Sequence, residues 1–191
     1  MIDSDADNVR KLYGIRRSER VLLKIVLSAM LAAVAVSLSG FSFPVGPSRC
    51  FPFQHAVNAI AGILLGPWWA ACAAIVSSTI RNFLGTGTVL AFPGSVFGAL
   101  AVGFAADALP ERFRALAAFA EPLATGTIGA WVSALIMAGS AKSAMFGMLA
   151  TAFMASSAPG ALIGFLLLGA AAATLGRGTR ISQDKPGGLG R

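Results

Sequence analysis

Charged residues are scarce in this chain, and their scarcity excludes an ordinary soluble domain. Only 12% of the 191 residues are Asp, Glu, Lys or Arg, whereas 56% are hydrophobic. The charged share is about half of that in an average soluble protein. Almost all charges lie near the two ends of the chain or in short connections between long apolar stretches. The composition therefore predicts an integral membrane protein with one compact membrane domain.

Motifs for nucleotide binding and hydrolysis are also missing. The sequence has no G-x-x-x-x-G-K-[ST] loop, so energy for any pumping has to come from elsewhere. It has neither H-E-x-x-H nor G-x-S-x-G, which argues against an intramembrane hydrolase, although a dyad of Ser95 and His55 stays open. His55 is the only histidine and has no acidic neighbour in the sequence, so we predict no metal site.

Two cysteines are too few and too far apart for a disulfide framework. Cys50 precedes the second apolar stretch at one membrane face, whereas Cys72 lies early in the third, nearer the opposite face. No small-residue cleavage site closes the first apolar run. That run is therefore interpreted as a membrane helix and not as a cleaved signal peptide.

Six apolar stretches fit membrane-spanning helices. A helix rises about 1.5 Å per residue, so about 20 apolar residues cross a hydrocarbon core roughly 30 Å thick. Pro52 suits a helix start, Gly66-Pro67 is a turn signal, and Pro110 closes the fourth stretch. The second stretch is short for a full crossing. The predicted spans cover residues 21–39, 52–65, 67–83, 89–109, 121–138 and 144–175.

The segments around these spans complete the predicted map. Residues 40–51, with Pro44, Gly46 and Pro47, predict a loop, and residues 111–120 predict a helix in the membrane interface. Pro159-Gly160 is a candidate kink in the long last span. Residues 1–20 and 176–191 are expected to be cytoplasmic tails on either side of one membrane domain, residues 21–175.

The basic residues predict the orientation. With a cytoplasmic N-terminus, six spans place twelve of the fifteen Lys and Arg residues inside and leave Arg49, Arg81 and Lys142 outside. The positive-inside rule favours this arrangement, and five or seven spans would put one basic tail on the wrong side. The net charge of +7 therefore indicates topology rather than a nucleic-acid partner. We predict an all-α membrane protein of six transmembrane helices with both termini cytoplasmic.

Polar side chains gather where the second, third and fourth spans reach the extracytoplasmic side. Polar groups that face lipid are costly, so this cluster is expected to face the bundle interior or a watery cavity. Its cation, carboxamides, imidazole and aromatic rings, with Phe53 as a further stacking candidate, suit a small polar heterocycle better than a metal or a lipid. The candidate binding residues are Gln54, His55, Asn58, Arg81, Asn82, Thr86, Thr88, Phe92 and Ser95.

Structural interpretations of the same residues stay open. The cluster would also serve to cap helix ends, and Arg81 alone would reach the outer headgroups by snorkelling. Glu121 is the only acid deep in an apolar stretch, which makes it a functional candidate. Its position before Pro122 equally fits a cap at the cytoplasmic start of the fifth span, and the residues alone favour that cap.

Small residues form a stripe on the first span. Ala29, Ala33 and Ser37 recur every four residues, a spacing that lets another helix approach closely. The other helix could belong to a second protein or to this chain, because alanine is abundant throughout the sequence.

Several segments resemble the ThiW family. They are FPFQHAVN at 51–58, LGP at 65–67, RNFLGTGT at 81–88 and AFPGS at 91–95, and the similarity in organisation covers residues 20–175. The segment EPLATGTIG at 121–129 is also similar to the family, which raises Glu121 and Thr125 as binding candidates.

The resemblance implies a six-helix S component, the substrate-capture subunit of an energy-coupling-factor (ECF) vitamin importer. Such a subunit is not an enzyme and carries no cofactor, since an ATPase pair and a coupling membrane subunit supply the energy. The implied substrate is the thiazole precursor of thiamine, hydroxyethylthiazole, and the stripe at Ala29, Ala33 and Ser37 resembles the surface used against the coupling subunit. An S component for another precursor such as a pyrimidine, an intramembrane enzyme and a structural subunit are the alternatives.

Overall fold

The computed structural model describes residues 2–45, 48–137 and 141–183, and nearly all of them are helical. A single short hairpin interrupts the helices within these ranges. The elements in chain order are α1 (Ile2–Ser37), η1 (Leu38–Gly40), β1 (Phe43–Val45), β2 (Ser48–Cys50), α2 (Pro52–Leu65), α3 (Pro67–Phe83), α4 (Ala91–Ala108), η2 (Glu111–Phe119), α5 (Ala120–Ala124), η3 (Thr125–Gly129), α6 (Ala130–Met137) and α7 (Lys142–Gln183).

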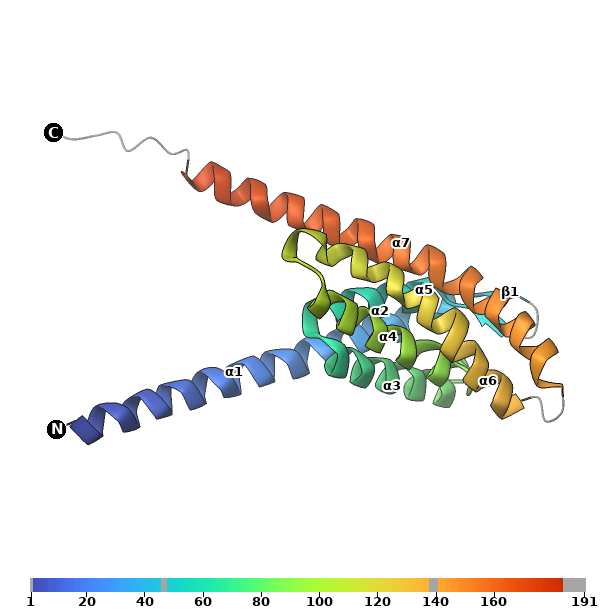
Figure 1. Cartoon of the computed structure of the whole chain (residues 1–191), viewed down its shortest axis with the longest axis horizontal. Helices are drawn as coiled ribbons and strands as arrows, with labels where there is room; N and C mark the ends of the chain where they lie inside the picture. Colours follow the sequence, from blue (N-terminus) through green and yellow to red (C-terminus); the bar gives the residue numbers. More distant parts are fainter. Residues whose placement is uncertain (1, 46–47, 138–140, 184–191) are drawn as a thin grey trace.

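The two ends of the described chain lie on the same side of the bundle. The first part of α1 and the last part of α7 extend away from that side, and the β1–β2 hairpin lies at the opposite end (Figure 1). Helix α2 is central, because it packs against α1, α3, α4 and α7 and buries ten of its 14 residues. The residues at the start of α2 are therefore enclosed by protein on several sides.

Close helix packing depends on small residues. Alanines from α2, α3 and α4 form one buried cluster with Leu65. Where α2 crosses α4, a Cβ on Gly62 would lie 2.6 Å from the Cγ1 atom of Val102, and a Cβ on Gly103 would overlap the backbone of Pro67. Glycine is required at these crossings because any side chain would push the helices apart.

Several predicted boundaries agree with the structure. Helices α2 and α3 begin at Pro52 and Pro67 and end at Leu65 and Phe83, as the proline and glycine signals indicate. Within the described residues, four helices are long and apolar enough to cross a membrane. They are Glu19–Gly40, Ala91–Ala108, Glu111–Met137 and Ser143–Thr174. With 14 and 17 residues, α2 and α3 rise only about 21 and 25 Å.

Two predictions about connecting segments are wrong. Residues 111–120 do not form a separate interfacial helix, since η2 continues directly through α5 and η3 into α6 as one helical segment of 27 residues. Residues 40–51 are not an irregular loop, because Phe43 pairs with Cys50 and Pro44 with Arg49 in an antiparallel hairpin. Gly46 and Pro47 lie outside the described residues.

The segments expected to be tails are largely helical in the described part of the chain. Helix α1 begins at Ile2, and α7 continues through Pro159 to Gln183 without interruption. Residues 184–191 at the end of the C-terminal tail, and Ala138 at the predicted end of the fifth span, lie outside the described residues.

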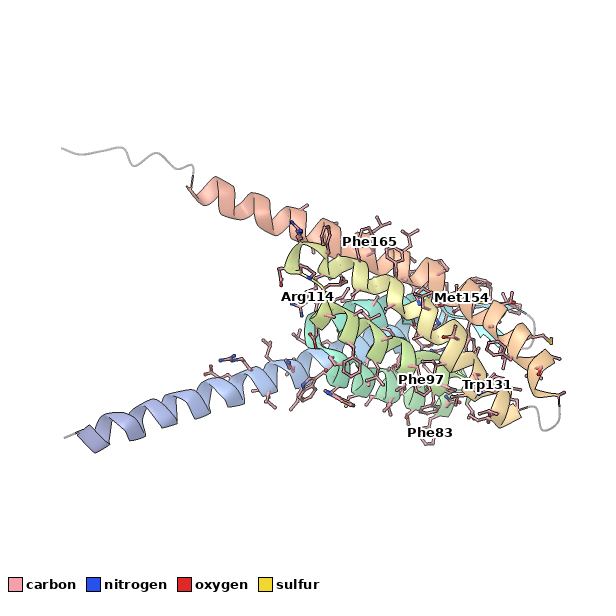
Figure 2. All side chains as sticks on the ribbon, viewed as in Figure 1. Phe83, Phe97, Arg114, Trp131, Met154 and Phe165 are labelled. Atoms are coloured by element: carbon pink, nitrogen blue, oxygen red, sulfur yellow. The ribbon has the colours of Figure 1, made fainter. Side chains whose placement is uncertain are left out.

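Large apolar side chains cover the outside of the bundle. Phe83 is 88% exposed and points away from the helices, and Trp68 and Leu123 are also exposed (Figure 2). A bundle with such a surface and a small-residue interior is suited to a lipid environment. Arg114 lies at the end from which the termini extend (Figure 2).

Candidate functional site

A buried pair of hydrogen-bonded side chains lies at the centre of the site. Nδ1 of His55 on α2 lies 2.5 Å from Oε1 of Glu121 on α5, within hydrogen-bond distance, although the two residues are 66 positions apart. Glu121 is fully buried and His55 is 6% exposed. A carboxylate in such surroundings needs hydrogen-bond donors, because water is excluded from it.

Other polar side chains complete a network around this carboxylate. Nδ2 of Asn58 donates to Oγ of Ser95 over 2.8 Å and lies 3.5 Å from Oε1 of Glu121. The Thr125 hydroxyl lies 2.8 Å from the Gly94 carbonyl oxygen and 3.1 Å from Oε1 of Glu121. The contacts of His55, Asn58 and Thr125 with the carboxylate all reach Oε1, and Oε2 has no partner among the described residues.

The local backbone explains how Glu121 reaches this network. The carboxylate lies against Gly98 of α4, where a Cβ would be only 2.5 Å from both Oε1 of Glu121 and Oγ1 of Thr125. One turn after Glu121 the helix widens into the π-helical segment Thr125–Gly129. Such segments are rare and frequent at functional sites. The sequence analysis missed Gly98, whose only signal is its position one turn after Gly94 on α4.

This position rules out the interpretation of Glu121 as a helix cap. The span begins ten residues earlier, at Glu111, so Glu121 lies inside the bundle and not at a membrane face. No capping hydrogen bond from a side chain begins α5. The resemblance-based expectation placed Glu121 and Thr125 with the polar cluster, and the structure brings both residues to it.

Arg81 occupies the end of α3 without an acceptor. Its side chain is completely buried, and Nε and both terminal nitrogens lack a hydrogen-bond partner among the described residues. The guanidinium lies over the ring of Phe51, with Cζ 3.8 Å from the ring centroid. Such stacking contributes about 2 kcal/mol when water is excluded. Arg81 does not snorkel to the surface, so that alternative is wrong.

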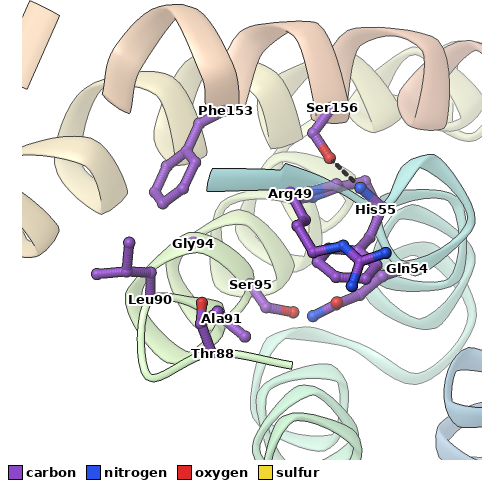
Figure 3. A pocket seen from close by; sticks show the side chains of 11 residues that line it. Arg49, Gln54, His55, Thr88, Leu90, Ala91, Gly94, Ser95, Phe153 and Ser156 are labelled. Carbon is purple, nitrogen blue, oxygen red and sulfur yellow. Dashed lines mark hydrogen bonds between the residues drawn. The ribbon is translucent and has the colours of Figure 1, made fainter. Parts of the chain in front are cut away.

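A small cavity lies beside the hairpin, between α2, α4 and α7 (Figure 3). Its volume of about 30 Å³ accommodates about two water molecules at roughly 10–15 Å³ each, and no five-membered ring. Figure 3 shows Arg49, Gln54 and Ser95 converging on one side of it and Phe153 on the other. The lining residues are Arg49, Phe51, Gln54, His55, Thr88, Leu90, Ala91, Gly94, Ser95, Phe153 and Ser156.

The hairpin over this cavity is attached to α7. The Phe51 backbone N–H donates to the Ser156 hydroxyl over 2.7 Å, and the Cys50 thiol donates to the Ala152 carbonyl over 3.4 Å. Burial raises the pKa of the Cys50 thiol, and a hydrogen bond with Ser156 offsets part of that increase. Both cysteines are free: Cys50 is buried, and Cys72 is exposed on α3. The sequence analysis did not identify Arg49, Phe51, Phe153 or Ser156 as site residues.

The remaining candidate residues lie in or near the loop after α3. Asn82 donates to the carbonyls of Ser78 and Thr88 and so holds the loop after α3. The Thr86 hydroxyl accepts from Ser39 and donates to the Arg81 carbonyl. Thr88 lines the cavity, whereas Phe92 does not. Asn82 and Thr86 therefore act in the structure as loop contacts, near the cavity but outside its wall.

The arrangement suits binding better than bond cleavage. The Ser95 hydroxyl accepts from Asn58, and no hydrogen bond joins Ser95 to His55 in the described part of the chain. In those residues no three His, Cys, Asp or Glu side chains come together as a metal site. The site instead combines amide, hydroxyl, imidazole and guanidinium groups around a small cavity, which is the chemistry of polar small-molecule recognition.

Comparison with known families identifies one match. The model of the family described as "Thiamine-precursor transporter protein (ThiW)" matches residues 25–174. The matched range includes every polar residue of the site and all of the candidate spans except the first six residues of Glu19–Gly40. The comparisons found no match among curated proteins or solved structures.

Proposed function

This chain belongs to the ThiW family of thiamine-precursor transporter proteins, and from that premise we propose that it captures a thiazole-type precursor, with hydroxyethylthiazole as the expected ligand. The observation that carries the proposal is the buried polar network of His55, Asn58, Ser95 and Glu121 beside a cavity. Buried polar groups of this density are costly unless they serve recognition or specify packing.

The location of the network supports capture from outside the cell. The cavity lies beside the hairpin, at the end of the bundle opposite the two termini (Figure 1). We propose six spans with α2 and α3 as short crossings and both termini cytoplasmic, because this places most basic residues inside. A reporter domain fused after residue 191 should then be active only in the cytoplasm, and activity outside the cell would refute the topology.

Energy for release is proposed to come from an ECF coupling subunit and its ATPase pair. The chain has no ATP-binding loop of the Walker type. Ala29, Ala33 and Ser37 are exposed on α1, so the small-residue stripe is open to a partner helix. Replacing Ala33 with Leu should abolish uptake in cells that contain the partners while leaving ligand binding by the isolated chain unchanged.

Binding is tested directly with the purified chain in detergent. We expect saturable binding of hydroxyethylthiazole by titration calorimetry, and Thr125→Val should weaken it roughly three- to tenfold through loss of one hydrogen bond. Thr127→Val is the matched control, since Thr127 is exposed two residues away and donates only to the Leu123 carbonyl. Tight binding of hydroxymethylpyrimidine with no response to hydroxyethylthiazole would reassign the substrate.

The same preparation separates the other classes of function. An intramembrane enzyme that uses Ser95 would convert the ligand without partners and lose turnover in Ser95→Ala, whereas a capture subunit releases its ligand unchanged. In a purely structural subunit, Asn58→Ala would lower stability and no small molecule would bind selectively. Mass spectrometry of compounds retained after gentle purification detects a natural ligand without assuming its identity.

A further inference from the structure

The charges around the cavity are unbalanced. Arg49 lines the cavity, Arg81 lies behind Phe51, and His55 adds an imidazole. Among the residues that the structure describes, Glu121 is the only carboxylate that contacts these groups. That carboxylate is already held by His55, Asn58 and Thr125. The described acids outside this network, such as Glu111, lie toward the opposite end of the bundle with Arg114. The cavity therefore has an excess of positive charge.

Arg81 carries most of this imbalance. Guanidinium groups bind carboxylates and phosphates through paired N–H donors. Every side-chain nitrogen of Arg81 is buried and has no acceptor within the described part of the chain. An unpaired buried charge is strongly unfavourable, and stacking on Phe51 compensates for only part of that cost. The arrangement is that of a donor group awaiting an acceptor.

Phe51 connects Arg81 to the cavity. The same aromatic ring forms part of the cavity wall and covers the guanidinium. Because the cavity of about 30 Å³ is too small for a heterocycle, binding requires a wall residue to move. Rotation of Phe51 would enlarge the cavity and uncover the Arg81 donors in one movement.

We propose that this site binds its heterocyclic ligand as an anion, through a carboxylate or phosphate whose oxygens accept from Arg81 after Phe51 has turned aside, with Arg49 as a second cation. The proposal rests on the function proposed above and sharpens its substrate class. It predicts that a thiazole bearing an acidic group binds more tightly than the neutral alcohol. The ring itself remains against the amide and hydroxyl groups of Gln54 and Ser95.

The test compares three probes on the purified full-length chain at neutral pH. They are hydroxyethylthiazole, its phosphate monoester, and the thiazolylacetate in which a carboxylate replaces the alcohol carbon. We expect at least one anion to bind at least about tenfold tighter than the alcohol, as for a charge-assisted hydrogen bond. Which anion binds tighter distinguishes a phosphate site from a carboxylate site.

Variants then assign the preference to Arg81. In Arg81→Gln the preference for the anion should fall to within about twofold, while affinity for the alcohol stays close to that of the native chain; Arg81→Lys should keep part of the preference. Arg112→Gln, an exposed cation on η2, is the matched control and should keep all of it. The ratio of anion to alcohol affinity in the native chain decides the proposal even if Arg81→Gln does not fold.

Three outcomes would overturn the proposal. Equal or tighter binding of the alcohol by the native chain refutes it and leaves thiazole capture intact. A tenfold anion preference that persists in Arg81→Gln removes Arg81 from recognition. Absence of binding by all three probes refutes both this inference and the proposed substrate.

Discussion

A methyl group at Gly98 should disrupt the site from the opposite helix. In Gly98→Ala the new Cβ would lie 2.5 Å from Oε1 of Glu121 and from Oγ1 of Thr125, and 2.9 Å from Cδ of Glu121. These atoms can retreat only by lengthening the hydrogen bonds that join Glu121 to His55 and Thr125. We therefore expect both a loss of stability and a displaced carboxylate.

The magnitude follows from three contributions. Overpacking of a filled interior costs about 1–3 kcal/mol. Weakening the charged hydrogen bond to His55 adds about 1–2 kcal/mol. Removing a helical glycine returns about 0.5–1 kcal/mol. The free energy of unfolding of Gly98→Ala should therefore fall by about 1–4.5 kcal/mol. Affinity for the ligand should fall at least about tenfold, equivalent to about 1.4 kcal/mol.

Gly147 offers a matched control. It lies on helix α7, and a Cβ there meets no atom within 4 Å. Gly147→Ala should raise the free energy of unfolding by about 0.5–1 kcal/mol through helix propensity alone and leave binding unchanged. Both variants are measured by denaturant titration in detergent and by calorimetric ligand binding. If Gly98→Ala is as stable as Gly147→Ala and binds equally well, the carboxylate is not held where we describe it.

Three further variants or modifications test the surrounding structure. Glu121→Ala should lower the free energy of unfolding by about 3–5 kcal/mol because it leaves a buried partner unpaired, whereas Glu121→Gln should cost only about 1 kcal/mol; equal losses would contradict the ion pair. A polar maleimide should modify Cys50 only after unfolding in mass-spectrometric assays, since the thiol is buried and its raised pKa keeps it protonated near neutral pH; rapid labelling of the folded chain would mean that the hairpin is open. Gly160→Ala should destabilise the bundle by several kcal/mol, because its Cβ would overlap the Pro52 carbonyl, while Gly169→Ala, with no neighbour within 4 Å, should not; denaturant titration of the pair compares them.

The sequence predicted the class of protein and much of the helix map. Low charge and long apolar stretches identify a membrane bundle, and the helix bounds at Pro52, Leu65, Pro67 and Phe83 follow from proline and glycine chemistry. The position of Asn58 near the start of the second predicted span placed it in the polar cluster. These features are local, so a single chain segment carries enough information to reveal them.

The start of the fifth predicted span could not be located from local sequence features. Residues 111–120 carry Glu111 and two arginines, and their hydropathy alone favours an interfacial segment. Packing of the buried Ala117 and Ala118 against α2 and α4 makes them part of the span. That shift of ten residues moves Glu121 from a membrane face into the bundle.

The pairings within the site were decided only by the tertiary structure. His55 meets Glu121 across 66 residues, Arg81 meets Phe51 across α2 and most of α3, and Gly98 supplies the space for the carboxylate. Composition and spacing place polar residues at one level of the membrane, but they carry no information about which helices are neighbours. The sequence by itself therefore determined that polar chemistry would gather inside a membrane bundle. The packing of α2, α3, α4 and α5 determined which groups share the acceptor Oε1 of Glu121, which have no partner among the described residues, and how much room remains between them.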